Sequence, residues 1–432
     1  MLELHYNSQD GIAYRRMGLQ HKDEISSDSK GKPDLSRTSL PFPSPGGGRG
    51  GCPPGGKNHP GPASCRPGDD LASLYQLDTV KDRQRMRVPE KELENAKGLV
   101  IIDEAQRLPR LFPSLPNVLA ANNHDARFML VGGSPDNLLQ PGLEELRSEL
   151  GIHELPGLSL HEVGSENFPR LWLRGGLPGS FIANTNHESF KMRTQVTLDI
   201  TDNDAGRPGP PIAGGTLRSF LLSLAQYHGK PFDVVELARS FGVRNSTVQR
   251  YLDILHESMV IRLIPAFRAG SQAGEVILPK IFFNDTGILH NLLGIESIDD
   301  LEAGTKAAIS WKGFAMESVI RRIRAGTTEC YHWTIKTGQG VDLMVQRGGM
   351  RWGFELQYGE RAHITPSMKL AMHTLKLDRM DVIHRSEGPQ VLEGRIQVHT
   401  LESLPRSLRL PDGFERRPEF LEIEKELAEA EV

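Results

Sequence analysis

Regular alternation of hydrophobic and polar residues begins only after about residue 72 of this chain. LVIIDE (Leu99–Glu104) is a short continuous apolar run, typical of a strand buried on both faces of a parallel sheet. RFMLVGGS (127–134) repeats the pattern after a gap of helical length, and ELRSELGIHEL (145–155) indicates a helix and another short strand. These patterns predict a β-α-β unit.

The period becomes helical between residues 216 and 258. VVELARSFG (234–242) and NSTVQRYLDILHES (245–258) predict two helices joined by a turn at Gly242, with Asn245 as the N-cap of the second helix. The expected apolar face of that helix consists of Val248, Tyr251, Leu252 and Leu255. MVIRLIPAF (259–267) can follow as a wing, so the segment is interpreted as a winged helix.

A third block of mixed α/β order begins near residue 280, which suggests a sheet flanked by helices. Its expected elements are the strand KIFFND (280–285), the helix WKGFAMESVIRRI (311–323), strands at ECYHWTI (329–335), VDLMVQ (341–346) and RWGFELQ (351–357), a helix near 367–375, and a strand at DVIHR (381–385).

The fold class expected from these patterns is α/β with a winged-helix domain, and the family resemblance described below implies in addition a partial P-loop ATPase parallel sheet and an α/β endonuclease-like C-terminal domain. The expected division is a disordered segment without strand or helix periodicity (1–72), an incomplete ATPase core (73–180), a helical and winged-helix domain (181–270), an endonuclease-like domain (271–410) and a C-terminal helix (411–432).

Composition narrows the class of protein only slightly. The 432 residues are 38% hydrophobic and 25% charged, with a net charge of -4, so no overall basic excess points to nucleic acid. We find no apolar run of about 18 residues and no secretory signal, so neither a membrane partner nor export is expected. The three cysteines have unrelated spacings that fit neither a disulfide framework nor a zinc site, and a cytoplasmic location is expected.

GLVIIDEAQR (98–107) carries the first candidate chemistry. An apolar strand that ends in Asp103 and Glu104 suits the second nucleotide motif of P-loop ATPases, in which the aspartate holds the water shell of Mg²⁺ and the glutamate polarises the attacking water. The alternative is an acidic pair that only ends a buried strand and caps a helix.

This motif and three further stretches carry a family resemblance. IIDEAQRLPRLFPSL, FMLVGGS, LWLRGGLPGSF (171–181) and KIFFNDTGI together resemble a bacterial family of AAA-type ATPases with a C-terminal domain of uncertain function that has a restriction-endonuclease-like core. The resemblance runs from about Leu74 to Arg385. It implies ATP and Mg²⁺ as cofactors, ATP hydrolysis as the activity, Ser134 as the residue that senses the γ-phosphate, and ring-forming homo-oligomers among relatives.

The expected P-loop is defective in this sequence. GCPPGGKN (51–58) contains Gly56 and Lys57, but Asn58 replaces the hydroxyl that binds Mg²⁺, two prolines remove N–H donors, and no apolar strand precedes the loop. Read one base later, codon degeneracy permits GARRVGKTTLARQ, which is a P-loop like that of the family. We therefore hypothesise that the first ~70 residues are translated out of frame. A natural disordered extension is the alternative.

Two further sets of polar residues are candidates for sites. The resemblance places Glu317, Asp342 and Glu355 at the metal position of an endonuclease-like core, but Gln357 stands where such nucleases carry a lysine, which puts cleavage in doubt. These acids can instead cap strands or pair with Arg321, Arg322 and Lys336. DNA contact is expected from the start of the second helix of the pair, through Arg244, Ser246, Thr247, Gln249 and Arg250. The alternative is a winged helix that only covers the nucleotide or packs on the core.

The sequence therefore predicts an ATP-binding AAA-type ATPase family protein whose ATP binding is impaired as written. A DNA-binding winged-helix protein without enzymatic activity and a metal-dependent nuclease, with Lys336 as its lysine, remain alternatives. Arg193 and Asp199 are a further expected pair, in a salt bridge or in a role towards nucleotide.

Overall fold

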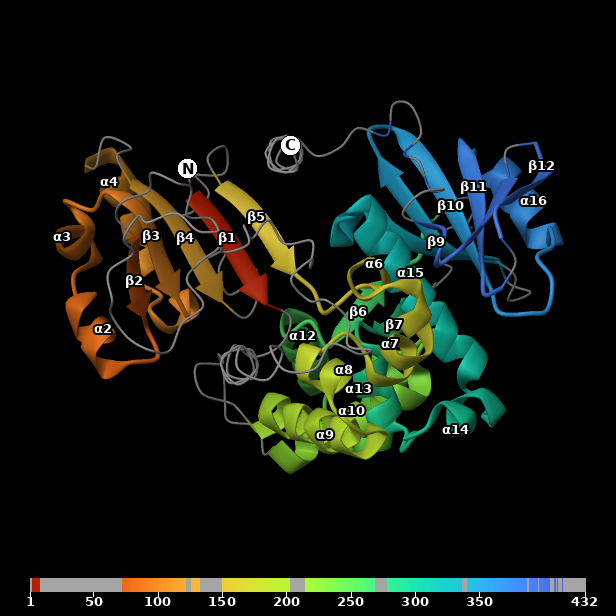
Figure 1. The fold of residues 1–432 in the computed structure, drawn as a ribbon, viewed down its shortest axis with the longest axis horizontal. Coiled ribbons are helices and arrows are strands. Elements are labelled where there is room, and N and C mark those ends of the chain that lie inside the picture. The colour runs from red at the N-terminus through yellow and green to blue at the C-terminus, as the bar shows by residue number, and fades with distance from the viewer. Residues whose placement is uncertain are drawn as a thin grey trace.

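The computed structural model describes residues 2–7, 72–121, 126–132, 150–202, 214–268, 278–335, 340–386, 388–394, 396–404, 408, 410 and 414. Within these ranges the chain forms a five-stranded sheet, a largely helical middle part with a two-stranded hairpin, and a six-stranded sheet near the C-terminus (Figure 1).

All neighbouring strands of the five-stranded sheet run parallel, in the order β2-β3-β4-β1-β5. The strands are β1 (Leu2–Asn7), β2 (Ala72–Gln76), β3 (Gly98–Asp103), β4 (Ala126–Gly132) and β5 (Leu150–Leu155). The predicted strands at LVIIDE, RFMLVGGS and LGIHEL are confirmed. The expectation that no strand lies before residue 72 is wrong, because β1 pairs in parallel with both β4 and β5. Its strand conformation is stabilised by hydrogen bonds to these two strands.

One face of this sheet is covered by α3 (Pro89–Leu93) and α4 (Leu111–Ala121), whereas α2 (Val80–Arg85) buries no residue. Val100 and Ile102 point into the core beneath these helices, whereas Leu99 and Ile101 belong to a separate cluster on the opposite face. Because alternate residues of β3 are buried on opposite faces, its continuous apolar sequence is explained. The strand ends at Asp103, and the 3-10 helix η2 (Ala105–Arg107) follows.

The middle of the chain is mainly helical. Its elements are α6 (Leu160–Val163), η4 (Ser165–Asn167), α7 (Phe168–Arg174), α8 (Pro178–Ile182), α9 (Asn186–Asp202), α10 (Gly214–Leu224), η5 (Ala225–Tyr227), α11 (Val234–Phe241), α12 (Asn245–Glu257), the antiparallel hairpin β6 (Ile261–Ile264) and β7 (Lys280–Phe283), α13 (Thr286–Leu292) and α14 (Ile298–Ala303). The predicted pair of helices and the strand after them are confirmed.

Gly242 ends α11 in the left-handed conformation, with φ of 63°. The expected apolar face of α12 is buried in one core with α10 and α11. The cap was assigned one residue too late: Arg244 is the N-cap, without a side-chain hydrogen bond, and Asn245 is the first helical residue.

The C-terminal sheet has the order β12-β13-β11-β10-β9-β8 and mixes parallel with antiparallel pairs. Its elements are α15 (Ala307–Ile323), η6 (Thr327–Glu329), β8 (Cys330–Thr334), β9 (Gly340–Arg347), β10 (Met350–Gln357), α16 (Pro366–Thr374), β11 (Arg379–His384), β12 (Gln390–Glu393) and β13 (Ile396–Thr400).

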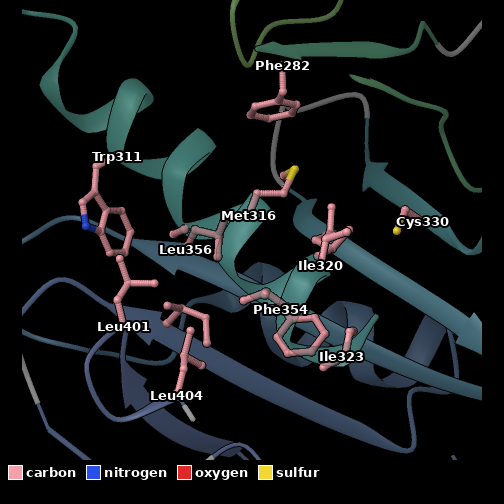
Figure 2. Close-up of a cluster of buried hydrophobic side chains, with 14 of the residues drawn as sticks. Phe282, Trp311, Met316, Ile320, Ile323, Cys330, Phe354, Leu356, Leu401 and Leu404 are labelled. Atoms are coloured by element: carbon pink, nitrogen blue, oxygen red, sulfur yellow. The ribbon is translucent and has the colours of Figure 1, made fainter. Parts of the chain in front are cut away.

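Helices cover both faces of this sheet, as predicted. Figure 2 shows Trp311, Met316 and Ile320 of α15 in one buried cluster with Phe354 and Leu356 of β10. On the opposite face of the sheet, Met368 and Ala371 of α16 are buried together with residues of the strands. The described residues are thus a mixed α/β protein, and none of their helices combines the length and apolarity needed to cross a bilayer.

Candidate functional site

The carboxyl end of β3 holds the acidic pair that the sequence singled out. Asp103 pairs in register with Gln76 of β2 and Val131 of β4, and its carbonyl accepts a hydrogen bond from Leu77 N at 3.0 Å. Glu104 adopts a left-handed conformation with φ of 58°, which is uncommon for a residue other than glycine and re-aims its side chain.

The carboxylate of Glu104 is held locally. Gln106 Nε2 donates to Glu104 Oε2 at 3.0 Å, and Arg107 Nε donates to the same oxygen at 3.2 Å. Ser134, Gly56 and Lys57 lie outside the described residues. Because β3, β4 and β1 are neighbours that run parallel, their carboxyl ends share one edge of the sheet, where ligands bind in open parallel sheets.

The start of α12 carries the residues predicted to contact DNA. Arg244, Ser246 and Gln249 are exposed, and Thr247 and Arg250 are partly buried. Gln249 Nε2 donates to Asp253 Oδ1 at 2.8 Å, so this face also carries an acidic group. These side chains are polar and face solvent, but their residue types do not indicate one particular ligand.

Asp342 and Glu355 lie on neighbouring strands, directly beyond the last residues that pair in register. Phe354 of β10 pairs with Leu343 of β9, and the two acids are the next residues along these antiparallel strands. Lys312 of α15 donates to both carboxylate oxygens of Asp342, at 3.0 and 2.8 Å, and Leu356 N donates to Oδ2 at 2.9 Å.

Glu355 Oε2 is shielded from solvent and has no hydrogen-bond partner. Burial, together with the neighbouring charge of Asp342, raises the pKa of Glu355 to about 8. Burial and the charge of Lys312 lower the pKa of Lys280, while Asp342 and Glu355 oppose that shift. For Lys312, burial opposes the charged form, but the charge of Asp342, the hydrogen bond to Asp342 and the charge of Glu355 together raise the pKa. Four ionisable groups from four elements therefore influence one another here.

Glu317, the third predicted metal ligand, makes a different contact. Arg262 of β6 donates from Nε to Glu317 Oε1 at 2.6 Å and from Nη2 to Oε2 at 3.1 Å, and both side chains are buried. In the described part of the chain, no three His, Cys, Asp or Glu side chains come close enough to hold a metal ion. The proposed three-acid ligand set is therefore wrong, because Glu317 is committed to Arg262, and only Asp342 and Glu355 remain together.

Gln357, at the position where nucleases carry a lysine, forms two hydrogen bonds to the backbone of His363 in the segment after β10. Its Nε2 donates to His363 O at 2.8 Å, and its Oε1 accepts from His363 N at 3.0 Å. Lys336, the lysine suggested by the sequence, lies outside the described residues.

Arg193 does not pair with Asp199. Arg193 is fully buried and donates to the carbonyls of Ser189 at 3.2 Å, Leu173 at 3.2 Å and Gly287 at 2.7 Å. Asp199 is exposed and accepts from a neighbouring glutamine on its own helix. Burial lowers the pKa of Arg193 to about 10. The expected salt bridge is wrong, since Arg193 ties α9 to the ends of α7 and α13 through backbone carbonyls.

Sequence reasoning missed Lys280, Lys312 and Arg262. Lys280 and Lys312 lie 62 and 30 residues before Asp342, and Arg262 lies 55 residues before Glu317. No local spacing therefore marks them. The one available signal was a charged residue inside otherwise apolar stretches, as in VIRLI and ISWKGF.

The fold and the geometry define a mixed α/β protein with a carboxylate pair flanked by lysines. Residues 165–299 match a domain of unknown function (DUF8612). The chain is 36% identical over 313 residues to the uncharacterized proteins Rv2008c of Mycobacterium tuberculosis and Mb2031c of Mycobacterium bovis. The match covers 72% of this chain and 70% of each relative, and the chain therefore belongs to the same protein family as these two mycobacterial proteins.

Proposed function

We propose that this chain is an AAA-type ATPase family protein whose nucleotide site lies at the carboxyl edge of the five-stranded sheet. The observation that carries the proposal is the parallel order β2-β3-β4-β1-β5 with Asp103 at the end of β3. Strand β1 is inserted between β4 and β5, so the connections after β1 and after β4 leave towards opposite edges. Such a reversal marks the ligand crevice in open parallel sheets.

The residues at this edge fit Mg²⁺ and a nucleotide in part. Asp103 suits the water shell of the ion, which in such sites is held mainly by phosphates and a P-loop hydroxyl. Bound Mg²⁺ would neutralise phosphate charge. Glu104 is restrained by Gln106 and Arg107, so it must exchange these contacts before it can orient a water molecule. As written, residues 51–58 supply neither the hydroxyl nor a full set of N–H donors, and ATP binding is expected to be weak.

The test is to resequence the gene across the codons for Ser44 to Leu74 and assay both possible products for ATP hydrolysis. If one inserted or deleted base restores the glycine-lysine-threonine loop, the restored chain should hydrolyse ATP and its Asp103→Asn variant should not. An unchanged frame, with an as-written chain that hydrolyses ATP, would remove the case for an impaired loop.

Asp342 and Glu355 favour a second candidate function, metal-dependent cleavage of DNA. A shielded carboxylate oxygen without a partner, beside a second carboxylate, suits a hard divalent cation such as Mg²⁺, which is often bound by one or two carboxylates plus substrate phosphates. When bound, the ion would activate water and neutralise the phosphate. Lys312 can stabilise negative charge beside Asp342.

Plasmid DNA with Mg²⁺ or Mn²⁺ tests this second candidate. Cleavage by the full chain should be lost in Asp342→Asn, while Asp299→Asn, at an exposed acid of α14, should cut normally. If DNA is bound but never cut, the third reading, a DNA-binding protein without enzymatic activity, gains support. Its binding should weaken steeply as salt rises.

A further inference from the structure

Helix α16 buries one face against the six-stranded sheet and leaves the other face in solvent. Met368 and Ala371 pack on the strands, whereas Lys369, Leu370 and His373 are exposed. Figure 1 shows α16 on the side of this sheet that is turned away from the helical middle part. Leu370 is 42% exposed, so the outer face of the helix combines an apolar side chain with a lysine and a histidine.

A second lysine lies at the end of this helix. Lys376 is exposed and follows Leu375, the C-cap of α16. Lys369 Nζ lies 3.0 Å from Glu393 Oε2 of β12, but 61% and 60% of these two side chains are exposed, so their ion pair is weak and can be exchanged for another. We call four exposed residues the α16 surface: Lys369, Leu370, His373 and Lys376.

The described part of the chain ends near the same helix. The ring of Phe414, the last described residue, packs edge-on against Trp352 with 5.3 Å between the ring centroids. Arg351, directly before Trp352, donates from Nη1 to Leu375 O at 2.8 Å. The chain after Phe414 therefore starts close to the C-terminal end of α16. Residues 415–419 can span about 17 Å when extended, more than the roughly 10 Å between packed layers, so they can reach the other face of the sheet.

The sequence that follows is complementary to the α16 surface in charge and in apolar pattern. EFLEIEKELAEAEV (419–432) contains six glutamates and one lysine and is expected to be helical. Phe420 and Leu427 lie two turns apart on one side of such a helix, and Glu424 and Glu431 each follow one of them by four residues. The helix would therefore present an apolar stripe with acids beside it, which matches an exposed leucine among lysines.

We propose that residues 419–432 fold back as a helix onto the α16 surface of their own chain. The apolar stripe would cover Leu370, and the acids beside it would pair with Lys369 and Lys376. A connection of five residues gives an effective concentration on the order of mM, which favours the same copy over a second one. The inference depends neither on the nucleotide site nor on the acid pair. Docking would also occupy a basic surface that otherwise attracts polyanions.

Carbodiimide cross-linking of the full chain, read by mass spectrometry, tests the contact directly. The reagent joins a lysine amine to a carboxylate only where the two touch. Links from Lys369 or Lys376 to glutamates of 419–432 are expected, and the Lys312–Asp342 pair, 2.8 Å apart, is the internal positive control. A mixture of isotope-labelled and unlabelled chains separates links within one copy from links between copies, and links within one copy are expected.

Chymotrypsin cleavage after Phe420 measures the docking in variants of the full chain, because proteases cut the open form of a segment. Lys369→Glu/Lys376→Glu should speed this cut about fivefold, since two ion pairs become repulsive contacts. Lys191→Glu/Lys230→Glu is the matched control, with the same change of charge at two exposed lysines of the middle part, and should cut like the parent chain.

Charge reversal in the segment itself gives the reciprocal test. Glu424→Lys/Glu431→Lys should also speed the cut, whereas Glu422→Lys/Glu429→Lys, on the opposite side of the expected helix, should not. The combination of Glu424→Lys/Glu431→Lys with Lys369→Glu/Lys376→Glu should restore slow cleavage. Tryptophan emission checks that every variant is folded.

Three results would overturn the proposal. The first is equal cleavage in all folded variants, and the second is the absence of links to Lys369 and Lys376 when the Lys312–Asp342 link forms. Links found only between labelled and unlabelled chains would assign the surface to a second copy instead. Fast cleavage in the parent chain that slows only when a DNA duplex is added would assign it to nucleic acid.

Discussion

The buried ion pair between Arg262 and Glu317 gives the sharpest prediction about stability. Only 6% and 7% of the two side chains are exposed, and the guanidinium makes two hydrogen bonds to the carboxylate. Arg262→Met leaves the Glu317 carboxylate buried without its main partner, and removal of one partner of such a pair costs about 3–5 kcal/mol. Arg321 lies 4.0 Å from Glu317 and can compensate in part, so we expect a loss of about 3 kcal/mol.

The double variant Arg262→Met/Glu317→Leu separates the value of the pair from the cost of an orphaned charge. With both charges removed, the loss should fall to about 1 kcal/mol or less, because apolar replacements of similar volume are often tolerated. Urea unfolding followed by tryptophan fluorescence is the assay, since three of the four tryptophans lie in the core that contains α15: Trp172, Trp311 and Trp352.

Three results would contradict this reasoning. A loss below about 1 kcal/mol for Arg262→Met would mean that water or Arg321 satisfies Glu317 fully. A double variant as unstable as the single one would mean that the loss comes from packing. If Glu317→Gln instead keeps its stability but weakens Mn²⁺ binding, Glu317 is a metal ligand and the structural reading is wrong.

Three further predictions concern single residues. His290 is buried, and burial lowers its pKa from 6.5 to about 4, so the unfolded chain binds the proton first as the pH falls. His290 should therefore reduce the free energy of unfolding by about 2 kcal/mol between pH 7 and pH 5. Urea unfolding of His290→Asn should show a correspondingly flatter pH dependence. Gly287→Ala should cost about 3 kcal/mol in the same assay, because a Cβ would lie 2.1 Å from the carbonyl oxygen of Arg174; unchanged stability would refute the close approach. Gln357→Lys should lose both bonds to His363 and about 1–3 kcal/mol, seen as a lower Tm; a stable variant that gains DNA cleavage would show that the loop contact is dispensable.

Local patterns predicted those elements whose burial is periodic along the chain. Val100 and Ile102 face one core and Leu99 and Ile101 the other, so the apolar run of β3 was recognisable, as was the face of α12. Strand β1 was missed because its six residues pair with two strands that lie more than a hundred residues later in the sequence.

The site was only partly predictable for the same reason. Asp342 and Glu355 were identified from the resemblance to an endonuclease-like core, and they do lie on consecutive strands that pair. Lys312 was not, since the contact with Asp342 is set by how α15 packs on the sheet. Arg193 shows the opposite error: the family resemblance suggested a pair with Asp199, but the fold buries the arginine among backbone carbonyls.

The central claim is that the carboxyl edge of the five-stranded sheet is a nucleotide site whose loop is defective as written. Calorimetric titration of ATP with Mg²⁺ tests it most directly, with the chain as written compared with a chain in which residues 51–63 are replaced by GARRVGKTTLARQ. We predict no measurable heat for the first chain and micromolar binding for the second, lost again when Asp103→Asn is added. Tight binding by the chain as written, or none by the restored chain when it is folded, would contradict the account.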